Sequence, residues 1–219
     1  MSIVALLHFL VGTCSVVAGF TSLFAKKGSG IHKFAGLIYV IAMVILCLSG
    51  FYLSYVRELQ FTFLLSALSL YLVVTGWLAI KQNLLHTTVR ARLEVTCSAL
   101  LCLTCFALSA LGISLNWPYP STEPPYEAYA FIGLCTGFFV YGDIKQLMSG
   151  IHEKASQFKR HLTRIGASML IATIVFFLGN NHVLPDAFRT VPILLAPIVT
   201  VFVITSFYRF QYSQILERK

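Results

Sequence analysis

Histidines are the residues of this chain whose types and positions best support chemistry. If the long apolar runs cross a membrane, His8 and His182 lie near one border, whereas His32 and His161 open their runs from the other border, with His86 in a loop beside them. A neutral imidazole from each of two helices is the arrangement with which transmembrane b-type haem proteins bind iron. The two sets therefore predict haem b, or a zinc or copper site. The alternative is a set of interfacial histidines that bind water or lipid phosphate.

His32 and His161 form the pair best suited to a shared site. Both open their apolar runs from the same side, so they lie at similar depth whatever the helix tilts are. The basic neighbours Lys33 and Arg160 favour the neutral imidazole, which is the form that binds a metal or relays protons. We therefore expect the two rings to approach one another and to form the functional site.

Charged residues at the ends of apolar runs form a second candidate site. Asp143 closes one run, Glu94 opens another, and Arg160 and Arg164 open a third. A carboxylate at the edge of a membrane is expected to be paired, and Arg164 is the natural partner of Asp143 because the connection between their runs is short. The group predicts a helix-end clamp, or functionally a proton relay or an anion-binding gate.

The composition indicates that lipid surrounds most of the protein. Of the 219 residues 58% are hydrophobic and 11% are charged, where soluble domains have about 45–50% and about 25%. The mean hydropathy is +0.81. A soluble domain of this size lacks the interior volume to bury so many apolar side chains. We therefore attribute the net charge of +8 to basic residues in the loops on one side of the membrane, and we do not expect a nucleic-acid partner.

Apolar runs of about 20 residues predict an all-α bundle of seven transmembrane helices in a single transmembrane domain. The predicted spans are 3–25, 34–56, 59–80, 95–115, 128–148, 161–181 and 190–210. The first run is read as a retained helix, since it is longer than a signal sequence and has no basic residues before it.

Basic residues predict the orientation of the bundle. Of the 16 Lys and Arg residues, 14 fall in connections on one side or in the C-terminal tail, and only Arg57 and Arg189 fall on the other side. The positive-inside rule places the larger group in the cytoplasm. We therefore expect a multi-pass protein of the plasma (inner) membrane, with its N-terminus outside and its C-terminus in the cytoplasm.

Small residues and cysteines carry weaker signals. Gly133 and Gly137 have the G-x-x-x-G spacing that allows close helix contact, either inside the bundle or with a second copy or a membrane partner. Cys102 and Cys105 have a C-x-x-C spacing, but all six cysteines lie inside apolar runs. We interpret the thiols as small buried hydrophobic groups.

Several segments resemble a known group of sequences. The stretch from His8 to Met43, which contains A-G-F-T-S-L-F-A-K-K-G-S-G-I-H-K-F-A-G-L-I-Y-V, resembles the opening of predicted bacterial membrane proteins catalogued as domain of unknown function 2306. Later segments are similar at 71–78, 142–148, 160–164 and 176–179. The chain departs from the group at Thr163, where the relatives have Trp, and at 180–182, where they have a Gln-rich turn. The resemblance implies a membrane protein without an assigned activity.

Three function classes fit these observations. The first is a membrane-embedded binding or redox protein with a site built from His8, His32, His161 and His182. The second is a small transporter or channel in which Asp143, Glu94, Arg160 and Arg164 line a pathway together with the inner histidines. The third is an accessory subunit that acts through helix packing.

Overall fold

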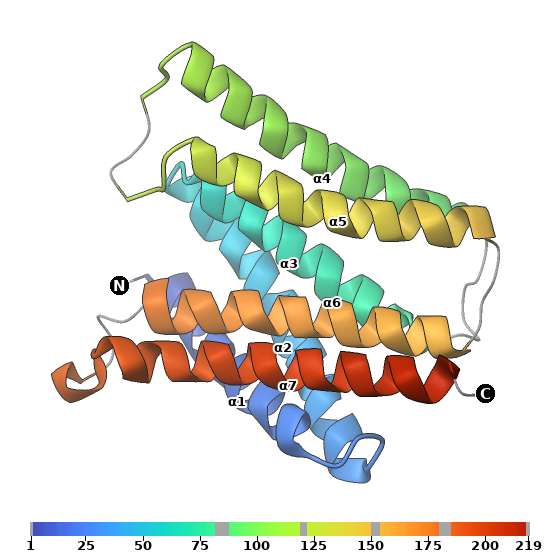
Figure 1. Ribbon diagram of the computed structural model, residues 1–219. Helices are drawn as coiled ribbons and strands as arrows, with labels where there is room; N and C mark the ends of the chain where they lie inside the picture. Colours follow the sequence, from blue (N-terminus) through green and yellow to red (C-terminus); the bar gives the residue numbers. More distant parts are fainter. Residues whose placement is uncertain (1, 82–87, 119–121, 150–153, 180–184, 218–219) are drawn as a thin grey trace. The chain divides into compact units, whose positions relative to one another are not determined.

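The computed structural model is all-helical over the residues it describes, which are 2–81, 88–118, 122–149, 154–179 and 185–217 (Figure 1). The α-helices are α1 (Ile3–Phe24), α2 (Gly30–Val56), α3 (Gln60–Leu78), α4 (Thr88–Ser114), α5 (Glu127–Ser149), α6 (Lys154–Ile174) and α7 (Val191–Glu217). A π-helical turn, η1 (Val175–Gly179), continues α6, and a short 3₁₀ helix, η3 (Asp186–Phe188), precedes α7. The predicted all-α class is confirmed for these ranges.

Six helices in the described part of the chain are long and apolar enough to cross a membrane: α1, α2, α3, α4, α6 extended by η1, and α7. The helices therefore support a multi-pass membrane protein. Among the described helices, α5 is not in this set, and it carries Glu127, Asp143 and Lys145. The count of seven spans and the orientation of the termini remain predictions.

Two helices begin seven residues earlier than the apolar runs predict. The predicted spans began at 95 and 161, whereas α4 begins at Thr88 and α6 at Lys154. An apolar run marks the part of a helix that fits the hydrocarbon layer, but backbone hydrogen bonds continue into polar sequence. In α4 this polar turn contains the Arg90–Glu94 ion pair at i, i+4 spacing, with 2.9 Å between Nε and Oε1. Such pairs stabilise helical turns.

The chain divides into two compact units by its internal contacts. Unit 1 comprises Met1–Leu46, Leu72–Ile80 and Glu153–Lys219, and unit 2 comprises Cys47–Tyr71 and Lys81–His152. The helices α2 and α3 each contribute one part to each unit. The expected single transmembrane domain remains a prediction, and the units are described separately below.

In unit 1, α6 packs beside α7 (orange and red in Figure 1). Gly166 of α6 allows this close approach, because a Cβ atom there would lie 2.9 Å from Cγ2 of Thr205 in α7. On another side of α6, the buried hydroxyls of Ser168 and Tyr39 are 2.7 Å apart and share a hydrogen bond. Small and hydroxyl-bearing residues are the usual means of joining helices in lipid.

In unit 2, α4 and α5 pack side by side (green and yellow in Figure 1). A Cβ atom at Gly133 would lie 3.1 Å from the ring of Phe106, and one at Gly137 would lie 3.6 Å from the Cys102 sulfur. The face formed by these two glycines therefore contacts α4 of the same chain. An oligomer formed through this face remains a prediction.

Candidate functional site

His32 lies where the turn after α1 enters α2. Gly28 has a φ of 81° in this turn, and the Ser29 hydroxyl accepts a hydrogen bond from the His32 backbone amide at 3.2 Å, as an N-cap residue does. The His32 Nδ1 atom is 3.0 Å from the Ser22 carbonyl oxygen. That carbonyl belongs to the last turn of α1, where carbonyls have no partner within the helix. The His32 ring thus caps α1.

His161 makes the corresponding contact with α3. Its Nδ1 atom is 2.9 Å from the carbonyl oxygen of Gly76, in the last turn of α3. In a regular α-helix the Ile80 amide would bond to the Gly76 carbonyl. Here it bonds to the Trp77 carbonyl, so the Gly76 carbonyl can accept from the imidazole. A Cβ atom at Gly76 would lie 3.0 Å from Cβ of Arg164, so a glycine is needed for α6 to approach this closely.

In both His32 and His161, Nε2 is the ring nitrogen that is left available to a ligand. A backbone carbonyl can only accept a hydrogen bond, so Nδ1 carries the hydrogen in both rings, and in the neutral imidazole Nε2 keeps its lone pair. Within the part of the chain that is described, neither Nε2 atom forms a hydrogen bond. Both side chains are partly exposed. Each Nε2 atom is thus the group with which these residues can bind a ligand or accept a proton.

Lys27 connects the end of α1 to α7. Its ammonium donates hydrogen bonds to the carbonyls of Leu23 at 2.6 Å and Ser22 at 3.2 Å. It also lies 4.7 Å from the centre of the Tyr208 ring in α7, in a cation–π contact. Burial lowers the pKa of Lys27. Lysine near a helix C-terminus is stabilised by the helix dipole.

The three basic side chains lie near one another. The Lys27 ammonium and the His32 Nδ1 atom both bond to the Ser22 carbonyl oxygen, and both side chains lie within electrostatic reach of His161. We call Lys27, His32 and His161 the basic-end cluster. Among the side chains of unit 1 that the structure describes, Asp186 has the only carboxylate; it precedes α7 and forms an ion pair with Arg189 at 2.7 Å. No described carboxylate of unit 1 therefore neutralises the basic-end cluster.

Unit 2 contains a buried carboxylate. Asp143 of α5 is 2% exposed. The Tyr71 hydroxyl of α3 donates a hydrogen bond to Asp143 Oδ2, and the Ser98 hydroxyl of α4 lies 3.3 Å from the same oxygen. A buried charged group requires such partners to offset its lost hydration.

The other predicted charged residues divide between the two units. Glu94 pairs with Arg90 in α4, a contact that the i, i+4 spacing could have indicated. Arg160 and Arg164 lie in α6 of unit 1, and Arg164 is 3% exposed. The predicted pairing of Asp143 with Arg164 joins residues of different units and remains untested.

Of the two predicted outer histidines, the structure describes His8, which lies far along α1 from the contact of His32 with Ser22. His8 precedes Ser22 by 14 residues in α1, which corresponds to about 21 Å along a helix axis. His182 lies outside the described residues. Over the described ranges, His, Cys, Asp and Glu side chains form no group of three or more that could hold a metal ion. The haem and metal hypotheses thus gain no support from these side chains.

Sequence reasoning missed four of the groups that build these sites. Lys27 could have been found as a basic residue just after the first apolar run, where it caps a helix. The Gly76 carbonyl gave no signal, because a backbone group has no sequence signature. Tyr71 and Ser98 gave none either, since each lies in an apolar run far along the chain from Asp143.

Comparison with known proteins adds no family. The chain matches no protein-family model, and neither the curated proteins nor the solved structures gave a significant match. The resemblance to domain of unknown function 2306 remains an expectation.

Proposed function

We propose that the protein is a membrane-embedded binding protein that takes an anionic ligand group at the basic-end cluster. One observation carries the proposal: Lys27 and His32 bond to the same carbonyl, that of Ser22, and lie within electrostatic reach of His161, while no described side chain of unit 1 brings a carboxylate there. The Lys27 ammonium is a partly buried cation, and a cation removed from water is costly without a counter-ion. A carboxylate or phosphate group would provide that counter-ion.

Each member of the cluster has a distinct role in this proposal. The Lys27 ammonium supplies positive charge. The backbone hydrogen bonds of His32 and His161 fix the ring orientations, so that Nε2 accepts a hydrogen bond from a protonated ligand or, after taking up a proton, donates one to an anion. Haem b or a metal ion would use the same two Nε2 atoms, but the nearby ammonium repels a metal cation. An absorption spectrum of the purified protein with a Soret band would favour the haem hypothesis instead.

The proposal is tested by calorimetric titration of the purified protein in a neutral detergent with inorganic phosphate. We expect saturable binding at constant ionic strength that is lost in Lys27→Gln and weakened in His32→Gln and His161→Gln. Lys145→Gln is the matched control, because Lys145 is an exposed lysine of unit 2. If Lys145→Gln and Lys27→Gln lose phosphate binding equally, the effect comes from net charge alone and the proposal is contradicted.

Proton-coupled transport is a second candidate function, favoured by Asp143. A buried ionisable group within a membrane bundle is a functional candidate in its own right, and two hydroxyl-bearing side chains surround Asp143. Proton uptake into liposomes that carry the protein tests this function. It is expected to disappear in Asp143→Asn and to persist in Asp186→Asn, since the Asp186 side chain is 91% exposed.

A further inference from the structure

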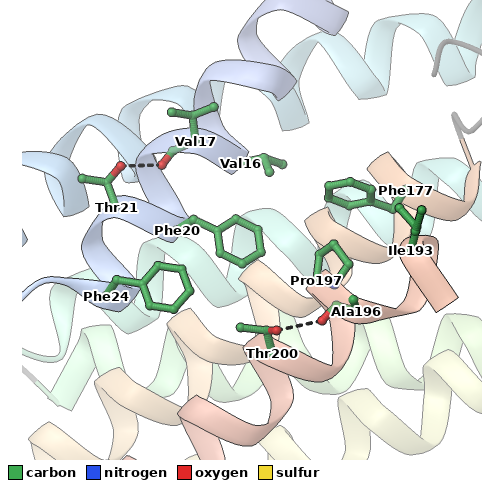
Figure 2. Close-up of a pocket in the computed structure, with 10 residues that line it drawn as sticks. All are labelled: Val16, Val17, Phe20, Thr21, Phe24, Phe177, Ile193, Ala196, Pro197 and Thr200. Carbon is green, nitrogen blue, oxygen red and sulfur yellow. Dashed lines mark hydrogen bonds between the residues drawn. The ribbon is translucent and has the colours of Figure 1, made fainter. Parts of the chain in front are cut away.

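A groove runs between α1 and α7 in unit 1 (Figure 2). One wall is formed by Val16, Phe20 and Phe24 of α1, and the other by Ala196, Pro197 and Thr200 of α7. Figure 2 shows the Phe20 ring directed toward the α7 wall. The groove has a volume of about 650 Å³, within the range of small-molecule sites.

The groove offers an occupant almost no polar partners. Its two hydroxyl groups are both bonded to their own helices: Thr21 donates to the Val17 carbonyl and Thr200 to the Ala196 carbonyl, each at 2.8 Å. The remaining lining side chains are apolar. An occupant must therefore be a hydrocarbon.

Two irregular stretches of backbone border the groove. Pro197 lies inside α7 and cannot donate a hydrogen bond to the carbonyl four residues before it, which belongs to the lining residue Ile193. The π-helical turn η1 carries the lining residue Phe177. Such turns are frequent at functional sites. The groove is thus associated with departures from regular helix in two of its elements.

Lys27 of the basic-end cluster lies beyond one end of the groove. Lys27 follows the groove residue Phe24 by three positions, and Tyr208, whose ring contacts Lys27, follows Thr200 by eight. Eight helical residues span about 12 Å. The two walls of the groove therefore lead to the same cation.

We propose that the groove holds one acyl chain of an anionic membrane phospholipid whose phosphate is bound by the basic-end cluster. This inference rests on the proposed function and names its ligand class. The charge of the cluster selects an anionic headgroup, and the apolar lining selects a hydrocarbon chain.

Native mass spectrometry of the detergent-solubilised protein tests the inference with two lipids that share the same oleoyl chains. We expect one dioleoyl phosphatidylglycerol to bind at least about tenfold more tightly than dioleoyl phosphatidylcholine, since the preference comes from charge. Ala196→Phe fills the groove and is expected to weaken phosphatidylglycerol binding about tenfold or more, the equivalent of roughly two displaced methylene groups. Val199→Phe is the matched control, because Val199 is 54% exposed on the same helix and outside the groove.

Val17→Trp narrows the groove from the α1 wall and repeats the test independently of α7. Circular dichroism and gel filtration of each variant establish that it is folded. Equal lipid binding in Ala196→Phe, Val17→Trp and Val199→Phe would overturn the assignment of the groove. So would equal binding of the two lipids.

Titration with glycerol 3-phosphate, which has no acyl chain, separates the two proposals. If the groove variants leave its binding intact and weaken only the lipid, the groove assignment is supported. If glycerol 3-phosphate binds through Lys27 but the groove variants do not affect the lipid, only the groove assignment fails. If glycerol 3-phosphate does not bind, or binds equally well to Lys27→Gln, the proposed anion site fails.

Discussion

His161 donates a hydrogen bond from Nδ1 to the backbone carbonyl of Gly76 at 2.9 Å. The contact joins α6 to the end of α3, and it satisfies a carbonyl that the helix leaves without a partner. It also directs the Nε2 atom of the ring away from the backbone. The same hydrogen bond therefore serves the packing of unit 1 and the proposed site.

Gly76 is expected to tolerate no side chain. In Gly76→Ala the added Cβ would lie 3.0 Å from Arg164 Cβ and 3.1 Å from Ile165 Cγ1, so α6 must move and the His161 contact weakens. We expect a loss of about 1–3 kcal/mol in the free energy of unfolding, measured by denaturation in detergent. Gly142→Ala is the control, because nothing lies within 4 Å of an added Cβ there. A similar stability for both variants would contradict the close α3–α6 packing.

Lys27 is expected to make stability depend on pH in the alkaline range. Burial lowers its pKa in the folded protein below the usual 10.5, so between these two values the unfolded chain binds more protons. Stability then rises with pH in that window, and the penalty for burying the charge is fully present below it. Lys27→Arg stays protonated throughout. The melting temperature of the wild type should therefore increase relative to that of Lys27→Arg as pH rises toward 10.5. A difference between the two melting temperatures that stays constant with pH would show that Lys27 does not cause the pH dependence.

Tyr71 is expected to stabilise unit 2 through its hydroxyl. Tyr71→Phe removes the hydrogen bond to Asp143, and a buried charge deprived of one partner costs about 1–3 kcal/mol. Tyr141→Phe makes the same chemical change at a side chain that is 68% exposed, and we expect an effect within about 0.5 kcal/mol. Chemical denaturation of both variants measures the difference. Equal losses of unfolding free energy in the two variants would mean that the Tyr71 hydroxyl does not stabilise Asp143.

The predicted pairing of Asp143 with Arg164 is open to a double-mutant cycle. Both side chains are buried, at 2% and 3% exposed. If they pair, Asp143→Asn or Arg164→Gln alone strands the other charge and costs about 3–5 kcal/mol, whereas the double variant loses less than the two together. Thermal unfolding in detergent measures all three. Additive losses would mean that the two residues do not interact.

The orientation is tested by labelling single cysteines in intact cells, in a variant without the six native cysteines. A cysteine at Ser121 is expected to react from outside, and one at Ser156 only after the membrane is permeabilised, because basic loops stay in the cytoplasm. The reverse pattern would overturn the predicted orientation.

The sequence by itself determined the all-α class and the positions of the six apolar helices, because lipid requires about 20 apolar residues per span and that requirement is visible in composition. It also indicated that His32 and His161 open their runs from one side. It did not reveal the polar first turns of α4 and α6, where backbone hydrogen bonding continues beyond the apolar run.

Only the tertiary structure decided which atoms these residues meet. The partners of His32 and His161 are backbone carbonyls, which every residue has, so no residue type marks the carbonyls of Ser22 and Gly76. The groove between α1 and α7 likewise depends on how two helices distant in sequence are placed. Hydropathy gives the depth of a residue in a membrane helix, whereas the direction of a side chain and the distance between helices come from packing.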